Sequence, residues 1–114
     1  MLRPLLAVAV GGVTGATARW VIGALLDHDT ATLLLANTAG TLLLGFVVAS
    51  YRRHTLGRTA LGTGVCGGLT TFSGLTVALA QHLESGALVS AAGLLITAFA
   101  LGVGAFGLGM RAAK

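Results

Sequence analysis

The sequence predicts an all-α membrane protein with four transmembrane helices, the third of them broken near its middle. The chain of 114 residues is 55% hydrophobic and only 9% charged, whereas soluble domains carry about 25% charged residues. Its apolar residues fall into four runs, each close to the roughly 20 residues that span the hydrocarbon of a bilayer. Short polar segments separate the runs, so we expect a single domain over residues 1–114 that lies in a lipid bilayer.

The first span is predicted at about residues 5–26, and it carries one narrow stripe of small residues. Gly11, Gly15, Arg19 and Gly23 recur every four residues, a spacing that places them on one helix face and lets another helix approach closely. Arg19 lies inside the span, where a charge is costly and usually faces water, a partner or a pathway. Two interpretations stay open: the side chain snorkels to the interface, or it supplies positive charge to an anion-attracting vestibule.

A signal peptide is the alternative interpretation of this first run. Arg3 would form its basic start, and Ala16-Thr17-Ala18 would form its small-residue cleavage site. The apolar residues continue as far as Leu26, which favours a complete span.

The second span, at about residues 31–50, contains the amide of Asn37. Asn37, Gly40, Thr41 and Leu44 share one helix face by their spacing. An amide in hydrocarbon must find hydrogen-bond partners. We therefore expect Asn37 either to join two helices or to donate an N–H to a passing solute.

The third span, at about residues 61–80, contains the motif GVCGGLTTFSG over residues 64–74. Gly67 and Gly68 lower helical preference, and the hydroxyls of Thr70, Thr71 and Ser73 compete with the hydrogen bonds of the helix. Both features predict a break, and irregular backbone at this depth must be buried in protein or line a cavity. Freed carbonyls can hold a cation, and the restarting helix presents N–H groups to an anion.

Phe72 is the large side chain within this motif, and two roles are open for it. It either packs in the core or presents the positive edge of its ring to an anion. Weak contacts of the second kind permit rapid passage, whereas a fixed charge would hold a small anion and slow its exit. The fourth span, at about residues 87–110, completes the set.

The basic residues are strongly polarised between the two sides of the predicted membrane. Of seven basic residues, six fall on the side of both termini and the middle loop: Arg3, Arg52, Arg53, Arg58, Arg111 and Lys114. The loops on the other side hold Asp27, Asp29 and Glu84. By the positive-inside rule both termini are predicted to be cytoplasmic, in a multi-pass protein of the cell membrane. The basic residues are thinly spread and aromatics are few, so we expect no nucleic-acid partner.

Several other classes of function are disfavoured. The predicted spans contain no acidic residue, which weakens proton-coupled or cation-coupled transport, and with it a small four-helix multidrug exporter. His28, His54 and His82 are all placed in loops, and nothing resembles a hydrolytic triad or a metal cluster, so we expect no enzyme and no catalytic residues. Cys66 is the only cysteine, which excludes an internal disulfide. A non-conducting structural subunit of a membrane complex stays open as an alternative.

Three motifs resemble those of the Fluc (CrcB) family of fluoride channels: GGVTGATARW at 11–20, ANTAGTLLLG at 36–45, and GVCGGLTTFSG at 64–74. The resemblance implies passive export of fluoride, which lowers its toxicity in the cytoplasm, through a dimer of two oppositely oriented subunits. It places Asn37, Phe72 and Arg19 along an anion pathway, and we add Thr71 and Ser73 from the same motif. It also implies a structural Na⁺, which is not transported, held at the dimer centre by the backbone carbonyls of Gly67 and Thr70.

The chain departs from the family pattern at three places. The pattern TTFSTFS has its second Phe replaced by Leu75, a common Glu is replaced by Ala78, and a Gly-Thr pair is replaced by Thr32-Leu33. A dimer of identical opposed chains needs a chain that inserts both ways, and the six-to-none distribution of basic residues opposes that. We therefore predict a heterodimer with an oppositely oriented paralogue that supplies what Leu75 lacks. Such a dimer need not have two equal pathways.

Overall fold

The fold is known from a computed structural model, which describes residues 1–51 and 53–114. Arg52, one of the six residues behind the predicted orientation, lies outside the described residues. Four helices are long and apolar enough to cross a membrane: Leu2–Leu26, Asp29–Ser50, Leu56–Glu84 and Leu88–Ala112. The predicted all-α class with four spans is confirmed, and each helix extends beyond the apolar run that predicted it.

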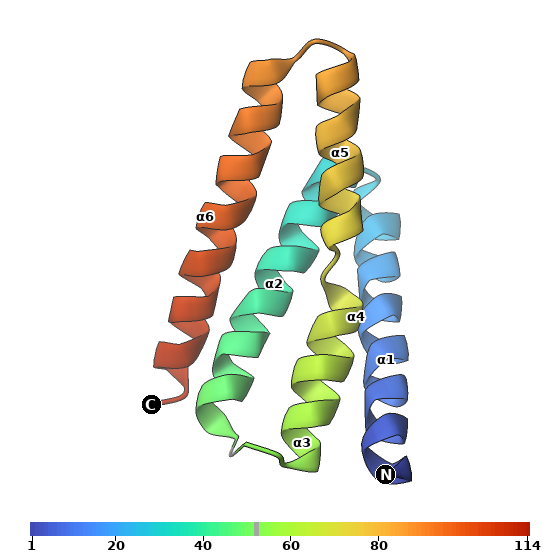
Figure 1. The fold of residues 1–114 in the computed structure, drawn as a ribbon, viewed down its shortest axis with the longest axis vertical. Helices are drawn as coiled ribbons and strands as arrows, with labels where there is room; N and C mark the ends of the chain where they lie inside the picture. Colours follow the sequence, from blue (N-terminus) through green and yellow to red (C-terminus); the bar gives the residue numbers. More distant parts are fainter. Residues whose placement is uncertain (52) are drawn as a thin grey trace.

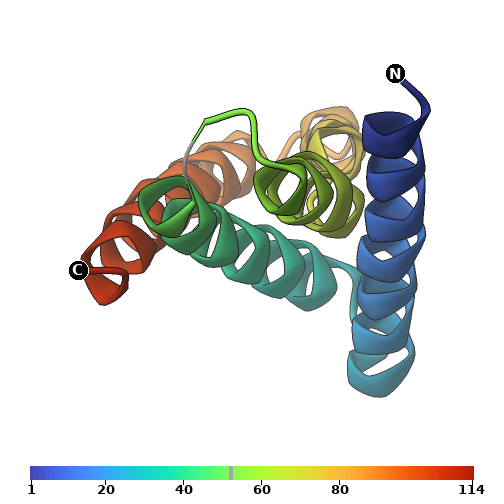
Figure 2. The same ribbon diagram turned by 90° about the horizontal axis from the view of Figure 1, so that it is seen from below.

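Three of these helices are continuous, and the third is divided. The first two are α1 (Leu2–Leu26) and α2 (Asp29–Ser50), and the last is α6 (Leu88–Ala112). The third consists of α3 (Leu56–Arg58), the π-helical segment η1 (Thr59–Cys66), α4 (Gly67–Leu69) and α5 (Phe72–Glu84). Both chain termini lie at one end of the molecule, called the terminal end below, and α5 occupies the other end (Figure 1). Figure 2 shows α1 crossing the other helices at a steep angle.

The connection between α1 and α2 is shorter than predicted. Asp27 ends α1 in the left-handed conformation, with φ 47°, and His28 caps α2 by accepting a hydrogen bond from Ala31 N at 3.2 Å. Asp29 and Thr30 thus belong to the first turn of α2 rather than to a loop. His82 was also placed wrongly, because it lies in the last turn of α5. Polar composition marked these segments as loops, but polar residues also suit the solvated ends of helices.

Helix α1 packs against the third helix through glycines. A Cβ atom at Gly11 would collide with the Ala60 carbonyl oxygen, and one at Gly15 would collide with the Val65 carbonyl oxygen. From the other side, Gly68 faces the Gly12 carbonyl with equally little room. Gly11 and Gly15 of the predicted stripe therefore lie in a close helix–helix contact, as small residues permit in a membrane, whereas Gly23 faces the Thr32 side chain of α2 with ordinary room.

Helices α2 and α6 form a second close pair in the same way. Gly45 abuts the Phe106 carbonyl oxygen, and Gly109 abuts the Leu42 carbonyl oxygen. Large apolar side chains on α6 point outward, among them Leu88, Val89 and Ile96. An outward apolar surface of this extent suits a lipid surround, and helix association then depends on close packing rather than on water exclusion.

We expect Gly109→Ala to destabilise the protein by about 1–3 kcal/mol, because the added methyl has no space beside the Leu42 backbone. The measurement is the thermal unfolding midpoint of the detergent-solubilised protein. Gly104→Ala is the matched control on the same helix, since nothing lies within 4 Å of a Cβ atom there. Equal midpoints for the two variants would show that the α2–α6 contact is not as close as described.

Candidate functional site

The break in the third helix consists of two threonines. Thr70 (φ −81°, ψ 153°) and Thr71 (φ −145°, ψ 118°) are both extended, and α5 restarts at Phe72. The Thr71 hydroxyl caps α5 by accepting a hydrogen bond from Gly74 N at 3.0 Å. The predicted break is confirmed, but Gly67 and Gly68 are themselves helical. The extended residues are the hydroxyl-bearing ones, whose side chains provide alternative hydrogen bonds.

Asn37 on α2 replaces the hydrogen bonds that the break removes. Its Oδ1 accepts from Thr71 N at 2.7 Å, and its Nδ2 donates to the Thr71 carbonyl at 3.0 Å. The amide thus satisfies both backbone groups of one extended residue, which confirms the helix-joining interpretation of Asn37. An amide nitrogen carries two N–H groups, so one N–H remains beyond the bond to Thr71.

The same exchange of partners frees a carbonyl of the preceding turn. In a continuous helix the Thr71 N–H would donate to the Gly67 carbonyl, but it donates to Asn37 instead. Gly67 is exposed, and nothing lies within 4 Å of a Cβ atom built there. The Thr70 carbonyl accepts a long hydrogen bond of 3.4 Å from Arg19 Nη1. The backbone oxygens of Gly67 and Thr70 are therefore weakly occupied by their own chain.

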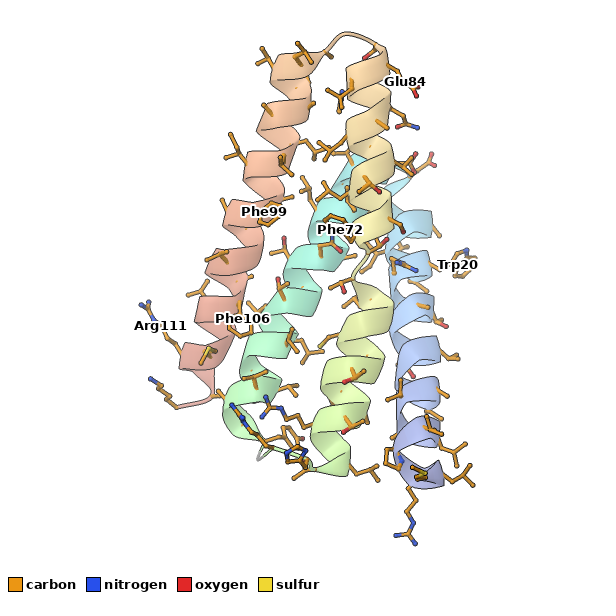
Figure 3. All side chains as sticks on the ribbon, viewed as in Figure 1. Trp20, Phe72, Glu84, Phe99, Phe106 and Arg111 are labelled. Carbon is orange, nitrogen blue, oxygen red and sulfur yellow. The ribbon has the colours of Figure 1, made fainter. Side chains whose placement is uncertain are left out.

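A cavity of about 430 Å³, called the central cavity below, lies beside the break. Its polar wall comes from Asn37, Thr41, Thr70 and Thr71, and its apolar wall includes Phe72 and Phe99. Phe72 is 71% exposed and Phe99 is 59% exposed, and the two rings lie at similar height along the molecule (Figure 3). An exposed phenylalanine beside polar groups at membrane depth is not core packing, so the core interpretation of Phe72 is wrong for the isolated chain.

A second cavity of about 460 Å³, the outer cavity, lies on the other side of the break, away from the terminal end. Its lining includes Arg19, Asp29, Thr71, Ser73 and Gln81. The hydroxyls of Thr71 and Ser73 lie 3.1 Å apart. The predicted pathway residues are thus divided: Asn37 and Phe72 line the central cavity, Arg19 and Ser73 line the outer one, and Thr71 lines both.

Most of the positions that depart from the family pattern converge on one apolar cluster. Leu33 and Leu75 are buried against Leu94, and Ala78 packs against the same cluster. Leu75 is only 4% exposed, so its side chain belongs to the core although it borders the central cavity. Three of the departing positions, Leu33, Leu75 and Ala78, thus belong to an apolar contact between α2, α5 and α6, and Thr32 lines the outer cavity.

Phe99 is the residue that the sequence reasoning missed. It faces the central cavity with Gly102 and Val103, and these positions share one face of α6 at i, i+3 and i+4 spacing. The spacing was visible in the sequence, but an apolar face alone does not distinguish a cavity wall from a packed contact or a lipid-facing surface.

Comparison with known proteins agrees with this geometry. The family model for "CrcB-like protein, Camphor Resistance (CrcB)" matches residues 6–110. The chain belongs to the CrcB family. A small multidrug exporter is thereby set aside as the identity of the chain.

Individual relatives are similar over most of their length. The "Fluoride-specific ion channel FluC" of Pectobacterium carotovorum subsp. carotovorum (strain PC1) is 40% identical over 102 residues, covering 82% of this chain and 80% of the relative. "Fluoride-specific ion channel FluC 1" of Yersinia pseudotuberculosis serotype I is 37% identical with the same coverage. "Fluoride-specific ion channel FluC 2" of Synechococcus sp. (strain CC9605) is 41% identical, covering 82% of this chain and 67% of the relative.

We expect Asn37→Ala to loosen the break, because the Thr71 N–H and carbonyl each lose their partner in hydrocarbon. At about 0.5–1.5 kcal/mol per hydrogen bond, hydrogen exchange of the peptide covering residues 67–74 should rise by about tenfold or more.

Thr41→Val is the matched control for this exchange measurement. The Thr41 hydroxyl bonds only to carbonyls of its own helix, at Asn37 and Thr38. Exchange that stays slow in Asn37→Ala would mean that other contacts hold the break.

Proposed function

We propose that this chain is a subunit of a channel that lets fluoride leave the cytoplasm passively, and that it carries out no enzymatic reaction. One observation carries the proposal: Asn37 holds open a break in a membrane-spanning helix, and this break places Phe72 in the wall of a cavity. Its relatives are named as fluoride-specific ion channels, and fluoride is the anion that we propose for this chain.

The groups around the central cavity suit a small, strongly hydrated anion. The second N–H of Asn37 is a hydrogen-bond donor, whereas the Thr41 and Thr70 hydroxyls already donate to backbone carbonyls. The edge of the Phe72 ring carries partial positive charge. None of these groups bears a full charge, so an anion is bound weakly enough to move on. The guanidinium of Arg19 in the outer cavity attracts anions without lying beside Phe72.

We propose that the working unit is a dimer of oppositely oriented subunits, and that the partner is a paralogue. The exposed Phe72 and Gly67 offer a face that a second subunit would cover. The basic residues at the terminal end favour cytoplasmic termini for this chain, and a partner inserted the other way would carry the opposite distribution. The numbered relatives FluC 1 and FluC 2 fit organisms that hold more than one such chain.

We propose a structural Na⁺ at the dimer centre, held by the backbone oxygens of Gly67 and Thr70. The Gly67 carbonyl has lost its helical donor, and the Thr70 carbonyl has only the long contact with Arg19. Carbonyls freed at a broken helix can hold Na⁺, and the open space at Gly67 leaves room for an ion. Two oxygens do not complete the shell of a cation, so the remaining ligands would come from the second subunit.

The Leu33–Leu75–Leu94 cluster supports an unequal pair of pathways. Donors and ring edges that would line one route are replaced by buried leucines. Leucine side chains cannot replace the hydrogen bonds that an anion loses with its hydration shell. The same cluster favours a second candidate function, in which this chain is a non-conducting structural subunit that assembles the channel while its partner provides the conducting residues.

The experiment that tests the function is fluoride efflux from liposomes containing either the purified chain or the chain co-expressed with a candidate paralogue. We expect efflux from the pair and little from the chain alone. In the pair, Phe72→Ile should slow efflux by about threefold to tenfold, because the ring edge is lost.

Phe46→Ile is the matched control, since Phe46 is an exposed phenylalanine on α2 and borders none of the cavities described above. Rapid efflux by the chain alone would exclude the heterodimer. Unchanged efflux in the Phe72→Ile pair, with assembly intact, would assign conduction to the partner and leave this chain the structural role.

We also expect the dimer to depend on Na⁺. Replacing Na⁺ by a large organic cation should shift purified dimers toward monomers, as measured by size-exclusion chromatography with light scattering. Because backbone carbonyls are not removed by substitution, the control is the effect of Li⁺ and K⁺ at equal ionic strength. Dimers that survive equally in all of these cations would contradict the ion site without affecting the proposal of fluoride conduction.

A further inference from the structure

A third cavity, of about 500 Å³, opens at the terminal end between α2 and the start of the third helix. We call it the basic cavity, because its polar lining consists of Arg53, His54, Arg58, Thr59 and Thr63. Arg53 is exposed and Arg58 is half-buried. The Arg58 guanidinium donates from Nη1 to the Tyr51 carbonyl at the long distance of 3.5 Å, and a guanidinium has five N–H donors in all.

The positive charge of this cavity is not neutralised by the acidic side chains of the chain. All three of them, Asp27, Asp29 and Glu84, lie in or beside the helix ends at the opposite end of the molecule, as Figure 3 shows for Glu84. A recess with low-dielectric walls and charges of one sign concentrates field lines and raises the local concentration of anions.

The basic cavity adjoins the central cavity. Leu44 and Gly62 line both of them, so these two residues form the junction. A Cβ atom at Gly62 would lie 3.6 Å from Leu44 Cδ1 and 3.7 Å from Val47 Cγ1. The junction is therefore narrow: a methyl group at residue 62 would make ordinary contacts with both side chains, and a larger side chain would fill the space between them. Beyond it lie Thr41 and then Asn37, which the wall of the central cavity also includes.

We propose that the basic cavity is the anion entrance at the terminal end, in which Arg53 and Arg58 collect anions that pass the Leu44–Gly62 junction into the central cavity. This inference rests on the proposed function and adds the residues that set the rate of entry. The arginines act by long-range attraction, so they raise the frequency of entry without setting the selectivity of the pathway.

Charge removal tests the entrance. Fluoride efflux at low fluoride concentration is compared between the double variant Arg53→Gln/Arg58→Gln and the native chain. Both are tested in the assembly that conducts in the experiment above, whether that is the pair with a paralogue or the chain alone. The Debye length is about 30 Å at 0.01 M salt and about 3 Å at 1 M. We expect efflux about threefold to tenfold slower than native at the lower ionic strength, and the difference should disappear at the higher one.

The matched control removes the same number of charges from the same end. Arg111→Gln/Lys114→Gln changes exposed residues of the C-terminal segment, which border neither the basic nor the central cavity, and it should conduct as the native chain does. An equal loss in both double variants would overturn the proposal, because the effect would then belong to the general surface potential. A loss seen only in vesicles with anionic lipid would also overturn it and assign the arginines to lipid headgroups.

Side-chain size at the junction gives a second, independent measurement. Gly62→Ala makes only ordinary contacts with Leu44 and Val47 and should conduct, whereas Gly62→Leu should fill the junction and abolish efflux while the dimer still elutes normally. Native efflux in Gly62→Leu would overturn the proposed route. If the unmodified pair shows no efflux, the proposed function fails. If the unmodified pair conducts and these variants conduct equally fast, only the proposed entrance is contradicted.

Discussion

The rest of the structure depends on two extended residues, Thr70 and Thr71, whose backbone must be hydrogen-bonded at membrane depth. Lipid provides no donors or acceptors, so each unsatisfied backbone group there costs several kcal/mol. The chain supplies the partners itself. Asn37 hydrogen-bonds both the N–H and the carbonyl of Thr71, and Arg19 donates to the carbonyl of Thr70. A break in one helix thus requires side chains from two others.

The glycines make this arrangement possible. Gly40 lies directly against the Thr70 methyl group and thereby lets α2 bring Asn37 within reach. Gly15 lies against the Val65 carbonyl and lets α1 bring Arg19 to the same place. Close approach by small residues is the ordinary means of helix association in membranes. In this chain it also positions the polar side chains that reach the break from α1 and α2, so the same glycines determine both the packing and the geometry of the site.

The sequence predicted much of this architecture for identifiable physical reasons. The lengths of the apolar runs determined the four spans, and an amide in hydrocarbon had to have partners, although the sequence did not show that both would be on Thr71. The position of the break was less predictable, because Gly67 and Gly68 suggested a weak helix. Gly68 instead permits contact with α1, and a glycine needed for close packing has the same appearance in a sequence as one that breaks a helix. The meeting of Leu33, Leu75 and Leu94 required the tertiary fold, since no local pattern relates residues on three helices.

The exposed wall of the central cavity supports the proposed association of two subunits. Its wall exposes freed backbone and an amide N–H beside Phe72, which is 71% exposed. Polar backbone of this kind is tolerated in the membrane only when protein or water covers it. Lipid tails against this wall would leave these groups unsatisfied, whereas a second subunit would cover the phenylalanine and enclose the polar groups in a narrow passage. The cost of exposing the break to lipid therefore favours association, and the same association would create the pathway.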